Sequence, residues 1–150
     1  MSTADPKPND GKRPSGCPVT FALDTFGDRW TLLIIREMMF HGRRTYGEFL
    51  EADEAISTNI LANRLKQLEF DGIIAKRRDP DNFRSFIYEL EPKGWDLAPI
   101  LLEIIQWSGK YDTRPGRLMH MVERVKNERQ ALEQEIEDRA IALRKTDDSE

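Results

Sequence analysis

The sequence predicts a mainly α-helical fold that carries one small β-hairpin. Three observations predict it. Apolar residues recur at spacings of three and four through most of the chain, the period changes to two over one short stretch, and a turn-forming run divides that stretch. The length of 150 residues fits one domain, or one domain with an appendage, and the longest apolar runs are too short to span a membrane.

Composition sets broad limits on the kind of protein. The chain is 39% hydrophobic and 33% charged, with a net charge of −4, which argues against a protein that coats nucleic acid generally but says nothing about local patches. Residues 1–16 are rich in Pro, Gly and small polar residues, so we expect a disordered arm without a secretory signal. A single cysteine excludes an internal disulfide framework and suits the cytoplasm, where we expect the protein to act.

Four helices are expected before the hairpin; Cys17-Pro18 opens the first, and the N-caps Asp28 and Ser57 start the second and the fourth. Their expected ranges are 17–27, 28–42, 45–50 and 57–71. The fourth has the clearest pattern, because Leu61, Leu65 and Leu68 form one apolar stripe and Ser57 is a natural N-cap.

The hairpin is expected from strands at 73–78 and 85–90, joined by the turn sequence Asp79-Pro80-Asp81-Asn82. A helix that is apolar almost all round should follow from Pro92 to about Tyr111. After a break, a last helix of nearly thirty residues carries a near-heptad seam from Leu118 to Leu143. That seam predicts pairing along one side, either with a second copy or back onto the chain's own body.

This order of elements is that of a winged helix-turn-helix, with residues 57–71 as the recognition helix and 73–91 as the wing. A helix that enters the major groove must avoid carboxylates, which the phosphates repel, and must offer groups that hydrogen-bond to bases. Between Ala55 and Leu68 there is no Asp or Glu, although the chain has 27 of them. The alternative interpretation of this segment is an ordinary amphipathic helix whose solvent-exposed face lacks acidic residues by chance.

The predicted DNA contacts lie on the outward face of this helix and on the basic arms of the hairpin. For base or near-base contact we expect Ser57, Thr58, Asn59 and Asn63; for phosphate or minor-groove contact we expect Arg64, Lys66, Lys76, Arg78 and Arg84. Arg64 lies at the border of the apolar stripe, where it can form a salt bridge within the fold instead. The hairpin cations can also serve only to protect an exposed strand edge from aggregation.

The chain resembles a known family, the HxlR-type winged-helix transcriptional regulators of bacteria, which are related to the MarR group. The likeness covers Cys17 to about Asp112 and rests on segments that include "CPVTFALDTFGDRWTLLIIREM", "YGEFLEADEAISTNILANRLKQLEFDGII" and "YELEPKGWDLAPIL". The matching positions are Cys17-Pro18, Gly27, Arg29, Trp30, Ile56-Ser57, Leu61, Arg64, Leu65, Leu68, Gly72 and Trp107. Thr45, Asp53 and Glu91 depart from the pattern, and none of them lies in the recognition helix.

The resemblance implies a homodimer that binds a palindromic operator in double-stranded DNA and acts on transcription, which we expect to be repression. Independently, the helix from Pro92 to Tyr111 has more apolar surface than one core can cover. We therefore expect a DNA-binding and dimerisation domain at 17–112 and a C-terminal helical extension at 113–150. The resemblance also makes Cys17 a candidate sensor of oxidants or electrophiles, against a bland role as a small residue that starts the first helix.

An enzyme is not expected. The sequence has no glycine-rich phosphate loop and no nucleophile motif, and its two histidines lie near no cysteine, so we expect neither a cofactor nor a metal site. Met38, Met39, Trp30 and Trp107 are expected in the core, with a small-molecule effector cavity as the other interpretation. The alternative function is a winged-helix module that binds another protein and no DNA.

Overall fold

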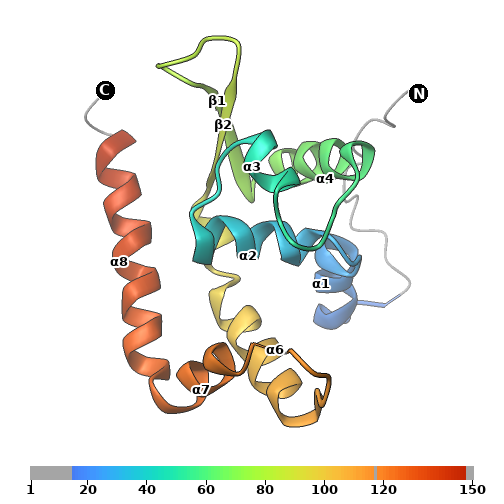
Figure 1. The fold of residues 1–150 in the computed structure, drawn as a ribbon. Coiled ribbons are helices and arrows are strands. Elements are labelled where there is room, and N and C mark those ends of the chain that lie inside the picture. Colours follow the sequence, from blue (N-terminus) through green and yellow to red (C-terminus); the bar gives the residue numbers. More distant parts are fainter. Residues whose placement is uncertain (1–14, 117, 148–150) are drawn as a thin grey trace. The chain divides into compact units, whose positions relative to one another are not determined.

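A computed structural model describes residues 15–116 and 118–147, and they form helices and one hairpin in the expected order, with two of the expected helices divided (Figure 1). The described chain divides into two compact units between Gly94 and Trp95. The expected arm at 1–16 lies, apart from its last two residues, outside the described residues. The elements of the first unit are α1 (Pro18–Phe26), α2 (Thr31–His41), α3 (Tyr46–Leu50), α4 (Thr58–Phe70), β1 (Ile74–Arg78) and β2 (Phe86–Leu90). Helix α5 (Pro92–Trp95) lies at the division, and the second unit holds α6 (Ala98–Tyr111), α7 (Met119–Asn127) and α8 (Arg129–Asp147).

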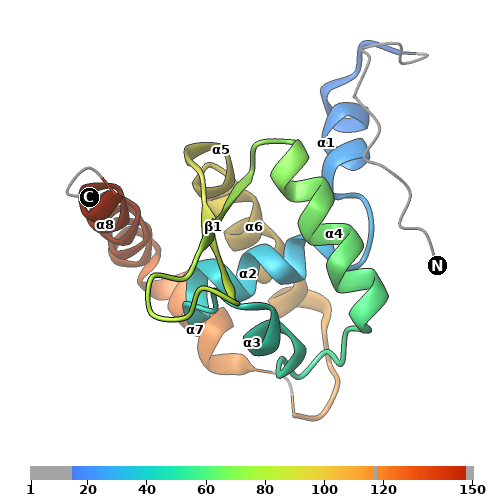
Figure 2. The same cartoon turned by 90° about the horizontal axis from the view of Figure 1, so that it is seen from above.

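The core of the first unit lies where α2, α3, α4 and the hairpin meet (Figure 2). The leucine stripe of α4 is buried as its spacing predicted. Helix α2 contributes buried residues that include Met38 and Met39, which confirms their place in the core, whereas Trp30 is only half-buried. Other large side chains that are fully buried in this unit are those of Ile35, Phe49, Ile73 and Ile74.

Capping groups set where the helices begin. The Thr45 hydroxyl accepts a hydrogen bond from the Glu48 amide at 3.3 Å, and the Ser57 hydroxyl accepts one from the Ile60 amide at 3.3 Å. The carboxylate of Asp28, the expected cap of the second helix, accepts from the amides of Trp30 at 2.9 Å and Thr31 at 3.0 Å, so the regular helix begins slightly later than predicted.

The two strands pair in antiparallel register, with Lys76 opposite Tyr88 and Arg78 opposite Phe86. This register puts Phe86, Tyr88 and Leu90 on one face, as the alternation predicted. Tyr88 also donates its amide to the carbonyl of Arg44 at 2.7 Å, so the segment between α2 and α3 is hydrogen-bonded to β2.

Two predicted helices are shorter than expected. The single helix from Pro92 to Tyr111 is wrong: the chain breaks at residues 96–97 and α6 begins anew, with Pro99 in its first turn. In a continuous helix the ring of Pro99 would collide with the carbonyl of Trp95, four residues earlier. The predicted last helix of nearly thirty residues is also two helices, because Glu128 leaves helical geometry between α7 and α8 (φ −128°, ψ 26°).

Within the second unit α7 lies against α6 and α8 turns back beside them. Where α6 packs on α7, a Cβ added to Gly109 would lie 2.2 Å from a Val122 methyl carbon. Most of the predicted seam is buried, through Val125, Leu132, Ile136 and Ala140, whereas its ends at Leu118 and Leu143 are exposed. The prediction that Trp107 belongs to the core is wrong, because 67% of its side chain is exposed.

Candidate nucleic-acid interface

The outward face of α4 is open and free of carboxylates over its first three turns. Ser57, Thr58 and Asn59 are exposed at the start of the helix, and Asn63 is half-buried one turn later. These positions combine short hydrogen-bonding side chains with backbone N–H groups that carry the positive end of the helix dipole. This face can therefore approach an anionic duplex with its hydrogen-bond donors and acceptors turned toward the DNA.

Two contacts fix where this helix starts. Ile56, the residue before the Ser57 cap, is anchored by its buried side chain. The Tyr46 hydroxyl on α3 donates a hydrogen bond to the Thr58 carbonyl at 2.8 Å. Ala55 adopts the left-handed region with a φ of 52°, which L side chains rarely do, so the chain turns sharply just before α4. The start of α4 is thus tied to α3, as in a helix-turn-helix.

Arg64 points into a contact within the fold. Its guanidinium lies 3.4 Å from the Asp28 carboxylate, and both residues line a shallow hollow beside Asn59 and Asn63. Burial would raise the pKa of Asp28, but hydrogen bonds from Thr31 and Trp30 and the charge of Arg64 together hold it below its usual range. The salt bridge that the sequence left open for Arg64 is therefore present in the free protein.

The base of the hairpin is held by one carboxylate. Glu89 on β2 accepts a hydrogen bond from Arg77 on β1 at 2.9 Å and another from Arg44, which precedes α3. Burial would raise the pKa of Glu89, but the hydrogen bonds and charges of Arg77 and Arg44 outweigh it and hold the pKa below its ordinary value. This contact fixes the hairpin against the helix-turn-helix.

The predicted wing cations are exposed, and two of them lie over aromatic rings. Lys76 Nζ lies 4.1 Å from the centre of the Phe86 ring, and the Arg78 guanidinium lies 5.0 Å from it. Arg84 is exposed beyond the strand ends. Lys66, in the C-terminal half of α4, is exposed too. The structure thus brings Asn59, Asn63 and Arg64 of α4 together around one hollow, and it places the wing cations on one hairpin of the same unit.

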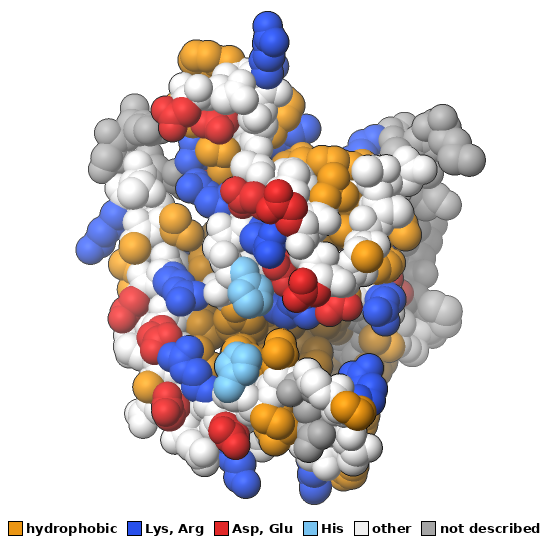
Figure 3. All heavy atoms as spheres, in the orientation of Figure 1, with side chains coloured by type: hydrophobic (Ala, Val, Ile, Leu, Met, Phe, Trp, Pro, Cys, Tyr) orange, Lys and Arg blue, Asp and Glu red, His pale blue; other side chains and the backbone are white. Residues whose placement is uncertain are grey.

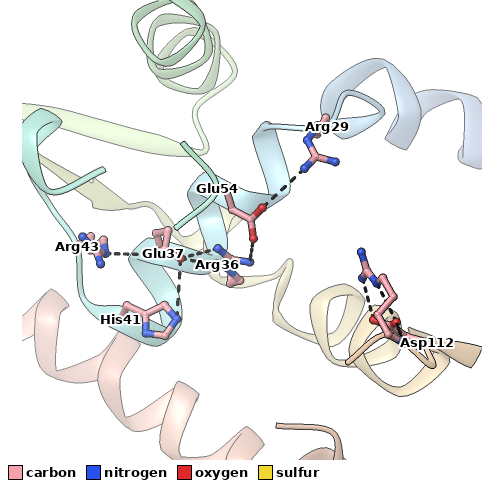
Figure 4. Close-up of polar contacts among 8 residues, drawn as sticks. Arg29, Arg36, Glu37, His41, Arg43, Glu54 and Asp112 are labelled. Atoms are coloured by element: carbon pink, nitrogen blue, oxygen red, sulfur yellow. Dashed lines mark hydrogen bonds and ion pairs between the residues drawn. The ribbon is translucent and has the colours of Figure 1, made fainter. Parts of the chain in front are cut away.

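Sequence reasoning missed a buried carboxylate that holds the scaffold together (Figure 4). Glu37 on α2 is only 6% exposed, and its oxygens lie 2.7 Å from Arg36, 2.7 Å from Arg43 and 3.9 Å from His41. Arg36 also reaches Glu54, which lies 3.5 Å away in the loop before α4. A glutamate at a core-facing position of α2, with basic residues one turn on, was the signal that could have indicated it.

A second residue that the sequence reasoning passed over is Phe83, in the turn of the hairpin. Its side chain is 72% exposed, the highest fraction among the large hydrophobic side chains of the described residues. Its position in a polar turn sequence hides it from any search based on periodicity.

Cys17 is exposed at the start of α1. The nearby backbone amides of Thr20 and Val19 hold the pKa of its thiol below the ordinary value. This is the environment in which a cysteine reacts, and it argues against the bland interpretation of a buried small residue.

The geometry is that of a helix-turn-helix with a wing, and comparison with known proteins agrees with it. A family model described as HxlR-like helix-turn-helix matches residues 25–115, which is more than half of the chain. The chain belongs to this family. HxlR-like proteins of this kind are transcriptional regulators, so the prediction of a regulator and not an enzyme is confirmed.

Individual relatives point the same way. The uncharacterized HTH-type transcriptional regulator sll1512 of Synechocystis is 35% identical over 86 residues, which cover 57% of this chain and 63% of the relative. The HTH-type transcriptional regulator YodB of Bacillus subtilis is 34% identical over 101 residues, which cover 67% of this chain and 88% of YodB.

Solved structures extend the likeness to the fold. The redox regulator HypR in its oxidized form matches with a TM-score of 0.58 and 28% identity, over 65% of this chain and all of that one. The reduced form of YodB from B. subtilis matches with a TM-score of 0.54 and 31% identity, over 69% of this chain and all of that one. Within the described residues, no helix is long and apolar enough to cross a membrane.

Proposed function

We propose that this HxlR-like regulator is a dimeric, sequence-specific DNA-binding repressor that acts in the cytoplasm. The observation that carries the proposal is the exposed, carboxylate-free face of α4, which leads with Ser57, Thr58 and Asn59. In this proposal α4 enters the major groove, and Lys76, Arg78 and Arg84 of the wing lie on the backbone or in the minor groove. Residues 17–112 serve DNA binding and dimerisation, and 113–150 form an appended extension.

Exposed apolar surface on two helices supports the dimer. On α6, Ile104, Trp107 and Tyr111 are all exposed, and a shallow apolar depression runs along the same helix past Pro99 and Ile100. Separately, α1 buries none of its own residues and exposes several large apolar ones. A two-fold dimer would cover such surface and would present two copies of α4 to half-sites about 34 Å apart, which requires a palindromic operator.

The test is a gel-shift titration of the purified protein against DNA from upstream of its own gene, repeated across a salt series. We expect saturable, sequence-selective binding that weakens steeply with salt, because each phosphate contact releases counterions. Reporter transcription from the same fragment should fall when the protein is present. Absence of selective binding would instead favour a winged-helix module that binds another protein.

A second proposal concerns the effector, and it rests on the exposed Cys17 thiol with its lowered pKa. Structures of HypR in oxidized form and of quinone-bound YodB show that related regulators meet oxidants and electrophiles. With one cysteine in each chain, the available reactions are addition of an electrophile to the thiolate, exchange with an oxidised small thiol, or a bridge between the two Cys17 residues of a dimer.

The variant Cys17→Ser tests the sensor directly. We expect the wild-type protein to lose DNA affinity on treatment with a quinone or with diamide, and the variant to keep its affinity under both. If Cys17→Ser loses DNA affinity under these reagents as the wild type does, Cys17 is not the sensor, and the DNA-binding proposal is unaffected.

A further inference from the structure

The turn of the hairpin exposes one large aromatic side chain between two arginines. The sequence from Arg78 to Arg84 contains two arginines and two aspartates, so its formal charge is zero. Charge alone therefore gives this turn little attraction to phosphates. The turn nevertheless presents Phe83 to solvent, with 72% of its surface exposed.

Hydrogen bonds within the turn hold this presentation in place. The Asp79 amide donates to the Ser85 carbonyl at 3.1 Å, and the Ser85 amide donates to the Asn82 carbonyl at 2.8 Å. The Arg78 guanidinium donates to the carbonyl of Phe83 itself at 2.5 Å. The backbone of Phe83 is thus fixed by an arginine that the proposed function already places at DNA.

The surroundings of the turn fit a nucleic acid better than a purely apolar partner. Apolar and basic side chains share the end of the hairpin, at the top of Figure 3, with acidic ones lower on the same loop. The hairpin belongs to the same compact unit as α4, and β1 contacts α4 directly. When α4 occupies a major groove, the wing of such a unit lies over the adjacent minor groove.

We infer that Phe83 is a minor-groove wedge: its ring enters the groove beside Arg84 and unstacks a flexible base step next to the recognition sequence. Apolar side chains that enter the minor groove in this way partly separate two base pairs and bend the duplex. Pyrimidine–purine steps such as TA yield most easily, so Phe83 adds a preference for such a step at a position where it makes no hydrogen bond to a base. This inference rests on the proposed function and adds a specificity-determining residue to it.

The experiment uses the full chain and a duplex selected from random-sequence DNA on the wild-type protein, with 2-aminopurine placed at each flanking step in turn. We expect the wild type to raise the fluorescence at one flanking step, because unstacking relieves quenching of that base. Phe83→Ala should bind about tenfold more weakly, lose this signal and keep the salt slope. Phe83→Leu should retain most of both affinity and signal.

Arg84→Ala is the matched control from the next position in the turn. It should keep the fluorescence signal while the salt slope falls by about one, because it removes one phosphate contact. Thermal melting of each variant checks that the fold is unchanged.

Three outcomes separate the possibilities. If the wild type binds its selected duplex and Phe83→Ala matches it in affinity and fluorescence, the wedge is overturned and the proposed function stands. If Phe83→Ala alters the sedimentation of the free protein, Phe83 is a contact between copies and the wedge is again overturned. If the wild type selects no DNA at all, the proposed function fails and the wedge fails with it.

Discussion

At the scale of single residues, we expect the start of α4 to determine which bases the protein prefers. Asn59 is exposed there and can pair with adenine through two hydrogen bonds. Arg64, by contrast, is engaged with Asp28 in the free protein. We therefore expect the two residues to contribute differently, Asn59 to the choice of DNA sequence and Arg64 mainly to the placement of the helix.

We expect Asn59→Ala to relax sequence preference, with a loss of about 1–3 kcal/mol in discrimination at one position of the operator. Selection from random-sequence DNA on wild type and variant measures this directly. Lys66→Ala is the control, since loss of a phosphate contact should weaken binding about equally on all sequences. A variant Asn59→Ala that selects the wild-type consensus would refute the assignment.

Glu89 gives the hairpin a dependence on pH whose sign follows from its lowered pKa. A carboxylate stabilised in the folded state contributes above its unfolded pKa, about 4.3, and loses that contribution as the pH falls through the lower folded value. We expect Glu89→Gln to be less stable than wild type at neutral pH. The gap should narrow as the pH drops below about 4.

Thermal melting of both proteins across this pH range measures the gap. Glu123→Gln, at an exposed position of α7, is the control and should track the wild type. A gap that stays constant with pH would mean that Glu89 acts by shape and not by charge.

At the scale of elements, the position of α4 depends on the leucines behind it. Leu65 is buried in the stripe of α4, whereas Ile60 on the same helix is 37% exposed. We expect Leu65→Ala to lower the free energy of unfolding by about 2–5 kcal/mol, and Ile60→Ala by less than about 1.5 kcal/mol. Urea denaturation of the two variants compares them, and equal losses would contradict the assigned orientation of the helix.

Periodicity predicted these elements because each signal is local. The stripe of α4, the cap at Ser57 and the strand alternation all depend on residues a few positions apart. The same approach failed at Pro99, whose collision with the preceding turn interrupts an otherwise helical pattern.

The contacts that hold the candidate site in place could not be predicted in this way. Glu89 meets Arg44 across a large separation in sequence, and Glu37 meets Arg43 only because the chain turns back after α2. Which charges pair depends on the completed fold, and the sequence shows only that both signs are plentiful. The exposure of Phe83 is likewise a property of the finished turn.

At the scale of the whole molecule, the apolar face of α6 should determine the oligomeric state. We expect Trp107→Glu to convert a dimer into a monomer, because two carboxylates would be buried against each other across a two-fold axis. Sedimentation measures the change in mass, and operator affinity should fall along with it. Gln130→Glu, at an exposed position of α8, is the control and should remain dimeric. A Trp107→Glu protein with wild-type mass would place the dimer contact elsewhere.

The close approach of Gly109 to Val122 has a practical consequence for the C-terminal tail, the part of the chain that holds α7 and α8. The tail lies beyond residues 25–115, so family membership says nothing about its task. One added methyl group at Gly109 would lie 2.2 Å from a Val122 carbon, so the Val122 side chain or α7 itself would have to shift. We expect Gly109→Ala to loosen the packing of α7 on α6 without shortening the chain. DNA binding by the regulator can then be compared with its C-terminal helices packed and loosened, at equal length and charge.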